Sequence, residues 1–120
     1  MNKDIKSKKY VLRFNIKNLD TFRDIKSGKK KVETRAATER YNKIQKGDIL
    51  VLVCGKERIE KEIIEAKHFK NLPGLLKTYS IGLIMPGRAK TLKEAQKIYF
   101  SYPGYEEKIK KFGLMAFKLK

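Results

Sequence analysis

The sequence is poor in residues that form covalent or metal cross-links. It has no tryptophan, one histidine (His68) and one cysteine (Cys54). A lone cysteine excludes an internal disulfide and a cysteine-based zinc site, and no group of His, Cys and carboxylate side chains has the spacing of metal ligands. We therefore expect no metal and no cofactor. A buried inert thiol is the expected role of Cys54, and a structural or surface role that of His68.

Long apolar runs are also missing. The longest, residues 49–54, is far shorter than the roughly 20 apolar residues that cross a bilayer. Residues 1–9 are polar and lysine-rich, without the apolar segment of a secretory signal. We therefore expect no membrane association and a location in the reducing cytoplasm. The 120 residues suffice for one domain, residues 9–120, preceded by a basic tail at residues 1–8.

Acidic residues are few for so charged a chain. There are 13 Asp and Glu residues against 30 Lys and Arg residues, a formal net charge of +17. Hydrophobic residues make up 41% of the chain, which argues against disorder. Such an excess of positive charge favours a polyanionic partner, and nucleic acid is the leading candidate. The alternative is a general lysine bias, as in heat-adapted proteins, but here glutamate does not keep pace with lysine.

Side-chain periodicity predicts an α+β fold of five or six strands and about three short helices. The expected strands are residues 10–16, 31–35, 49–54, 57–69 and 114–119. The expected helices are residues 18–27, 91–100 and 106–112, with single turns near 38–45 and 71–76 and an irregular segment at 78–90. Residues 57–69 also fit a helix, but the tight turn at Gly55-Lys56 favours a strand with a bulge.

Three residues are the expected helix N-caps: Asn18, Thr38 and Thr91. Thr91 is the strongest of them, because Glu94 follows three residues later and completes a capping box. Glycines after the last helical residue predict the other end of two helices, at Gly28 and Gly113.

The segment after Gly28 carries the densest charge pattern. Three lysines, Lys29, Lys30 and Lys31, come before an extended stretch that contains Glu33 and Arg35. Because side chains alternate along a strand, these last two project to one face and pair there, whereas Thr34 projects to the opposite face. Lys30 at the turn is expected to present its charge to an anion, so that its loss weakens binding but not stability. Loss of Glu33 is expected to lower stability as well.

The pattern Gly-x-Lys-x-x-Glu-x-Arg, filled by Gly28, Lys30, Glu33 and Arg35, resembles the signature of the ASCH domain, a branch of the PUA-like barrels. The likeness continues in order over residues 10–119, through Gly47-Asp48, Tyr102-Pro103-Gly104 and residues 112–117. The resemblance implies a PUA-like, small mixed-sheet β-barrel with helices over its openings.

The resemblance also implies binding of RNA or a nucleotide in a cleft beside the motif, and we predict that function. The candidate ligand-binding residues are Lys29, Lys30, Lys31, Glu33, Arg35, Arg88, Tyr102 and Tyr105. The lysines could grip phosphate or form a solvated run, and the Glu33–Arg35 pair could contact ligand or support the cleft. Two tyrosines, Tyr102 and Tyr105, are the expected exposed shelf for stacking on bases, whereas Phe100 and Tyr99 are expected in the core.

An enzyme is the alternative. Some small ASCH proteins that this chain resembles are amidohydrolases of acetylcytidine nucleosides, and they use the motif lysine, a threonine three residues later and a glutamate before the third helix. Lys30 matches the lysine, but Glu33 stands at the threonine position and Arg88 at the glutamate position. Lys30 and Glu33 are therefore the candidate catalytic residues, with Glu33 as a general base for water. Other ASCH members are similar to ribonucleases, and that activity also stays open.

Overall fold

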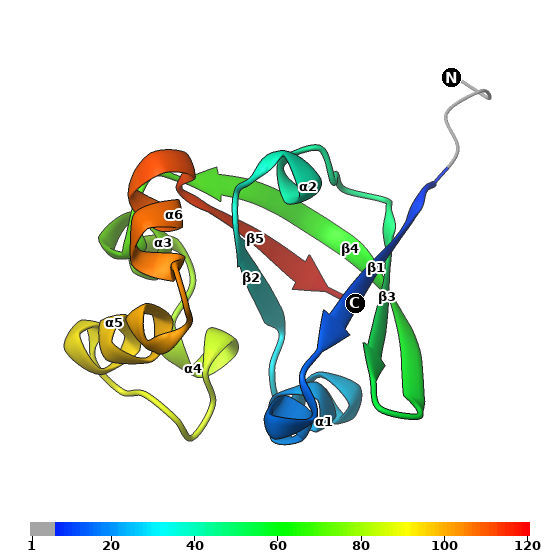
Figure 1. The fold of residues 1–120 in the computed structure, drawn as a ribbon. Coiled ribbons are helices and arrows are strands. Elements are labelled where there is room, and N and C mark those ends of the chain that lie inside the picture. The colour runs from blue at the N-terminus through cyan, green and yellow to red at the C-terminus, as the bar shows by residue number, and fades with distance from the viewer. Residues whose placement is uncertain (1–6) are drawn as a thin grey trace.

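In the described part of the chain, five strands form one curled sheet, a half-barrel, in the order β1-β3-β4-β5-β2 (Figure 1). They are β1 (Lys9–Phe14), β2 (Val32–Ala36), β3 (Ile49–Cys54), β4 (Glu57–Phe69) and β5 (Leu114–Leu119). The sheet is mixed, because β1 and β3 run parallel whereas the other neighbours are antiparallel. The expected α+β fold with a small barrel-like sheet is confirmed. The computed structural model describes residues 7–120, so residues 1–6 of the expected tail lie outside the described part.

The strand β4 makes the sheet curl. Its first half pairs with β3, its second half pairs with β5, and the register shifts between Ile63 and Glu65, where one half gives way to the other. A bulge bends a strand and increases its twist, so this shift turns β5 and β2 away from β1 and β3. The tight turn at Gly55-Lys56 joins β3 to β4. The prediction of a bulged strand over residues 57–69 is thus confirmed.

The described residues form six α-helices, not the expected three. They are α1 (Leu19–Ser27), α2 (Glu39–Asn42), α3 (Leu72–Thr78), α4 (Ile81–Ile84), α5 (Leu92–Ser101) and α6 (Tyr105–Phe112), with a 3-10 turn, η1, at Ile16–Asn18. The three helices expected from periodicity are α1, α5 and α6. Of the additional helices, α2 and α3 lie where single turns were expected, and α4 lies in the segment expected to be irregular. They have only four to seven residues, a length at which periodicity cannot separate a helix from a turn.

The helix caps follow the sequence in part. The Thr91 side chain accepts a hydrogen bond from the Glu94 amide at 3.2 Å, which confirms that cap. Asn18 and Thr38 stand at the N-cap positions of α1 and α2, but within residues 7–120 their side chains make no capping hydrogen bond. The cap near Asn18 is supplied instead by Asn15, whose side chain accepts from the Lys17 amide and starts the η1 turn.

The core has two parts, separated by β2 and β5. Met115 and Phe117 face the inside of the curled sheet, where Leu12 and Phe22 also pack. Leu114 and Ala116 face the opposite way, toward the helices α3 to α6 that lie beyond β2 and β5 in Figure 1. The alternation along β5 therefore places one strand between two apolar layers.

The single cysteine and the single histidine lie in structural or surface positions, as expected. Cys54 is buried, as expected of a structural thiol. The exposed ring of His68 lies 2.7 Å from the carbonyl oxygen of Phe112 and so meets the end of α6. Among residues 7–120, no helix has the length and apolar character that a bilayer crossing requires.

Candidate functional site

A cavity of about 290 Å³ lies where the two edge strands of the half-barrel, β1 and β2, approach without pairing. The end of β1 and the helix α1 form one side, and Lys30, Glu33, Thr34 and Arg35 form another. Residues of α4, α5 and α6 and the loop after α4 complete the lining. Half of the residues of the segment Gly28–Arg35 therefore border this cavity, which lies between the two unpaired edges of the open sheet.

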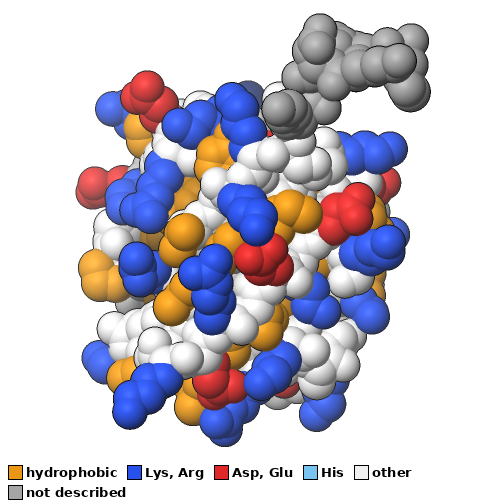
Figure 2. Space-filling model, turned by 90° about the vertical axis from the view of Figure 1, so that its right-hand side faces the viewer, with side chains coloured by type: hydrophobic (Ala, Val, Ile, Leu, Met, Phe, Trp, Pro, Cys, Tyr) orange, Lys and Arg blue, Asp and Glu red, His pale blue; other side chains and the backbone are white. Residues whose placement is uncertain are grey.

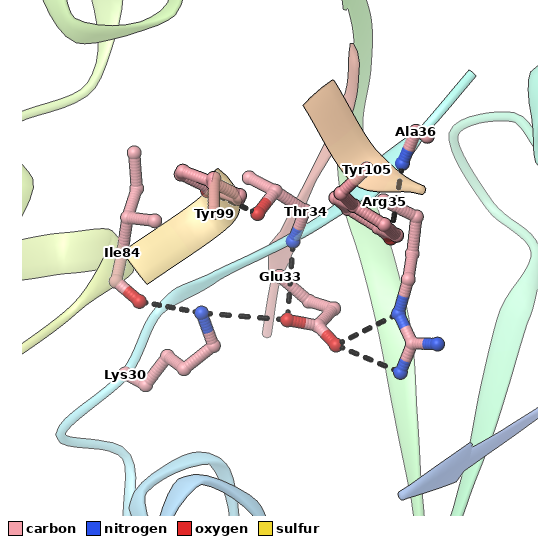
Figure 3. A network of polar contacts seen from close by, with 8 residues as sticks. All are labelled: Lys30, Glu33, Thr34, Arg35, Ala36, Ile84, Tyr99 and Tyr105. Atoms are coloured by element: carbon pink, nitrogen blue, oxygen red, sulfur yellow. Dashed lines mark hydrogen bonds and ion pairs between the residues drawn. The ribbon is translucent and has the colours of Figure 1, made fainter. Parts of the chain in front are cut away.

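The carboxylate of Glu33 organises this wall of the cavity (Figure 3). Its Oε1 accepts the backbone N–H of Thr34 at 3.1 Å and lies 3.4 Å from the Lys30 ammonium. Its Oε2 accepts two hydrogen bonds, each 3.2 Å long, from Nε and Nη2 of Arg35. The expected pairing of Glu33 with Arg35 is present. Because donors surround both oxygens, the carboxylate has a fixed position.

Lys30 is buried, which corrects the expectation that it extends freely from the turn. Only 6% of the residue is exposed, and the ammonium donates to the carbonyl oxygen of Ile84 at 2.5 Å as well as facing Glu33. Burial lowers the pKa of Lys30 against the opposing pull of the Glu33 carboxylate. Gly28, with φ of 88°, ends α1 in the left-handed conformation and directs the chain back toward the sheet. Lys30 therefore ties the turn to α4.

Arg35 is held by aromatic rings as well as by Glu33. Its guanidinium carbon lies 5.0 Å from the ring centre of Phe14 and 5.7 Å from that of Tyr41. Burial alone would lower the pKa of Arg35, but the Glu33 carboxylate and the neighbouring Tyr105 and Tyr41 hydroxyls raise it above its ordinary value. Arg35 is therefore a fixed cation of the cavity wall.

Thr34 borders the same cavity, although alternation predicted that it would face away. The cavity wraps around the free edge of β2, so side chains from both faces of that strand reach it. The Thr34 hydroxyl lies 2.5 Å from the hydroxyl of Tyr99, and burial raises the pKa of Tyr99 above its ordinary value. These two hydroxyls form a second polar pair beside the Glu33 network (Figure 3).

The tyrosines expected to form an exposed shelf, Tyr102 and Tyr105, line the cavity but are half-buried. Tyr102 and Tyr105 pack edge to face, with ring centres 5.5 Å apart. The Tyr105 hydroxyl accepts the backbone N–H of Ala36 at 3.3 Å, so it also caps the free edge of β2. Phe100 is 37% exposed, which corrects its expected place in the core, whereas Tyr99 is buried as expected.

The remaining predicted residues divide between the cavity and the open surface. Arg88, in the loop after α4, lines the cavity and is exposed. Lys29 and Lys31 are exposed side chains outside the lining of this cavity. The Lys31 backbone N–H donates to the carbonyl oxygen of Leu83 at 3.0 Å, so this residue contributes to the fold through its main chain.

Sequence reasoning missed Arg13 and Asp24, which also line the cavity. The lining thus contains four cationic side chains, Arg13, Lys30, Arg35 and Arg88, and two carboxylates, Asp24 and Glu33. No signal in the sequence brings β1 to this motif, since that contact depends on the curl of the sheet, whereas α1 leads directly into the motif along the chain. Within the described part of the chain, no group of three or more His, Cys, Asp or Glu residues could hold a metal ion.

Two solved structures share this fold across nearly the whole chain. The crystal structure of hypothetical protein PH0355 matches with a TM-score of 0.80 and 27% sequence identity, over 93% of this chain and 97% of that chain. The solution NMR structure of protein PF0455 from Pyrococcus furiosus matches with a TM-score of 0.69 and 24% identity, over 93% and 96% of the two chains. No protein-family profile and no curated protein matches the sequence.

Proposed function

We propose that this protein is an RNA- or nucleotide-binding module of the ASCH type, and that the cavity between β1 and β2 receives one nucleotide unit. The observation that carries the proposal is the convergence of three motif side chains. Lys30, Glu33 and Arg35, on which the ASCH resemblance rests, form one bonded network on the wall of that cavity. If these motif residues served only to pack the core, they would not be expected to lie together on the wall of a cavity.

The size and lining of the cavity support a nucleotide as the ligand. A volume of about 290 Å³ is at the lower end of the range of ligand pockets and suits a single base with its sugar, not a duplex. Tyr102 and Tyr105 offer aromatic surface for a base, and the Thr34–Tyr99 hydroxyl pair offers hydrogen-bonding partners. The polar groups are already fixed by their partners, so binding costs little reorganisation.

Charge supports the same class of ligand. The cavity contains more cationic than carboxylate side chains. Lysine and arginine side chains also spread over the whole molecular face shown in Figure 2, with few acidic side chains among them. On a chain with a net charge of +17, this surface attracts the phosphates of a strand that extends beyond the cavity. Under this proposal the protein acts in the cytoplasm, where RNA and free nucleotides are abundant.

Replacement of Tyr102 tests the proposal against a matched aromatic control. A short fluorescently labelled single-stranded RNA is titrated with the parent protein, Tyr102→Ala and Phe100→Ala. Phe100 is exposed on α5 outside the lining of this cavity. Stacking is worth about 1–3 kcal/mol per base, so we expect Tyr102→Ala to weaken binding roughly ten-fold and Phe100→Ala to bind like the parent. Equal affinity of all three proteins would contradict a base site in the cavity.

An amidohydrolase is the second candidate, and one observation favours it. The Thr34 hydroxyl and the Lys30 ammonium, whose pKa burial lowers, border one cavity. A lysine and a hydroxyl in one site can act together on an acyl group. Against it, the Glu33 carboxylate is engaged by Lys30 and Arg35, which leaves it a poor general base for water.

A further inference from the structure

We infer that Arg13 and Arg88 bind the phosphate of the ligand, so that the cavity takes a phosphorylated nucleotide in preference to the free nucleoside. This inference rests on the proposed function and makes it more specific. It also moves the phosphate-binding role away from the lysine run at the start of the motif, where the sequence pattern pointed.

The other two cations of the cavity are already engaged. Lys30 has 6% of its side chain exposed and is divided between the Glu33 carboxylate and the Ile84 carbonyl. Arg35 has 17% of its side chain exposed and makes two hydrogen bonds to Glu33. A phosphate beside either cation would also lie beside the Glu33 carboxylate, whose negative charge would repel it.

Arg13 and Arg88, by contrast, are available to a ligand. Both are exposed, and both line the cavity from separate parts of the chain, Arg13 from the end of β1 and Arg88 from the loop between α4 and α5. Within residues 7–120, neither side chain makes a hydrogen bond or an ion pair. Two available guanidinium groups therefore border one space that already has a fixed polar wall.

Guanidinium groups suit this role for a geometric reason. Each presents parallel N–H donors that match two oxygens of a phosphate, and arginine keeps its charge at any physiological pH. Asp24 is the lining carboxylate outside the Glu33 network, and its charge opposes an anion placed beside it. The phosphate is therefore expected beside the two arginines and away from Asp24, with the base against Tyr102 and Tyr105.

The test compares ligands that differ only by phosphate. The parent, Arg13→Gln, Arg88→Gln and Arg58→Gln proteins are titrated calorimetrically with the four ribonucleosides and with their 5′- and 3′-monophosphates. Arg58, an exposed arginine of β4 paired with Glu60, is the control for loss of one positive charge away from the cavity. Melting curves verify that each variant is folded.

We expect the parent to bind at least one monophosphate about ten-fold or more tightly than its nucleoside, since hydrogen bonds between charged groups have that effect. Arg13→Gln and Arg88→Gln should each reduce the preference for the monophosphate several-fold. Each should change the affinity for the nucleoside by less than about two-fold. Arg58→Gln should behave like the parent.

Two results would overturn the inference, and they are distinguishable. Equal affinity of the parent for nucleosides and monophosphates, or a preference that survives in both cavity variants, overturns the assignment of Arg13 and Arg88 while nucleotide binding itself stands. Absence of binding of every nucleoside, every monophosphate and a short RNA at low salt overturns the proposed function and this inference together.

Discussion

Glu33 and Arg35 lie two residues apart on β2 and are joined by two hydrogen bonds of 3.2 Å, both to Oε2 of the carboxylate. The other oxygen faces Lys30 at 3.4 Å. One carboxylate thus bridges two cations at the margin of a cavity. The arrangement makes specific predictions about stability, pH dependence, chemistry and binding.

Removal of Glu33 should be the most damaging change in the network. Glu33→Gln leaves Lys30 and Arg35 near each other without a neutralising carboxylate, and loss of one partner of a buried pair costs about 3–5 kcal/mol. Arg35 is only partly buried, so we expect the lower end of that range. Denaturant unfolding monitored by circular dichroism measures the loss. An unchanged free energy of unfolding would show that the pair contributes nothing to the fold.

Lys30→Met should also lower stability, contrary to the expectation from the sequence. The ammonium is buried and donates to Ile84, so its loss leaves that carbonyl and one oxygen of Glu33 without this donor. Arg35 and the Thr34 amide still hold the carboxylate, so we expect a smaller loss of about 1–3 kcal/mol. The double variant with Glu33→Gln should lose less than the sum of the two single variants. Additive losses would contradict direct coupling.

The stability of the protein should fall as pH rises above about 10. Burial raises the pKa of Tyr99, so between the ordinary tyrosine value and the raised one the folded state holds a proton that the unfolded chain releases. The stabilisation is complete below pH 10 and is lost above it. Lys30, with its pKa lowered from 10.5, acts below that pH and in the opposite direction.

Tyr99→Phe should reduce the steepness of this fall. The free energy of unfolding is measured between pH 10.5 and 11.5 for the parent and the variant, a window set by the ordinary pKa values of lysine and tyrosine, about 10.4 and 10. Burial also raises the pKa of Tyr105, so part of the slope should remain. Identical slopes in the two proteins would show that Tyr99 does not titrate differently in the folded state.

Turnover of acetylcytidine should be absent or very slow. The hydroxyl expected for an amidohydrolase is replaced by the engaged carboxylate of Glu33, and the Thr34 hydroxyl is paired with Tyr99. Incubation of the nucleoside with the protein, followed by chromatography, measures any deacetylation. Turnover that disappears in Lys30→Ala would establish the hydrolase and refute this prediction. Intact RNA in a parallel incubation would argue against a ribonuclease.

The sequence predicted those parts of the site that depend on neighbours along the chain. Alternation on a strand placed Glu33 and Arg35 on one face, and glycine chemistry ended the helix before them at Gly28. The burial of Lys30 could not be predicted, because the carbonyl that accepts its hydrogen bond belongs to Ile84, 54 residues later. From the sequence alone, a lysine in a run of three is expected on the solvated surface, because the tertiary contact that buries it is not visible there.

Two other differences between the sequence-based expectation and the structure concern Thr34 and Phe100. Thr34 lines the cavity because the edge of β2 is free and the cavity wraps around it, a consequence of a sheet that stays open. Phe100 is exposed and Tyr99 buried because Ala95 and Tyr99, four residues apart, share the buried face of α5. That spacing could have been recognised in the sequence.

The approach of Arg13 to the motif could not be predicted from the sequence, because it requires β1 to lie at the far edge of a curled sheet.

Salt dependence should identify the electrostatic part of RNA binding. Each single-strand phosphate contact contributes a slope of about −0.7 to the logarithm of affinity against the logarithm of salt concentration. We expect Arg88→Gln to make the slope less steep by about one such contact and Arg58→Gln to leave it unchanged. Fluorescence anisotropy across a salt series measures both slopes. Equal slopes in the parent and Arg88→Gln would remove Arg88 from the phosphate contacts.

The most direct test of the account maps the ligand onto the protein. A short single-stranded RNA is titrated at low salt into isotope-labelled protein while backbone amide resonances are followed by NMR. The account predicts saturable shifts concentrated at Lys30 to Arg35 and at Tyr102, around the cavity between β1 and β2. Shifts confined to the lysine-rich surface away from that cavity, or no shifts at all, would contradict the claim that the cavity binds a nucleotide.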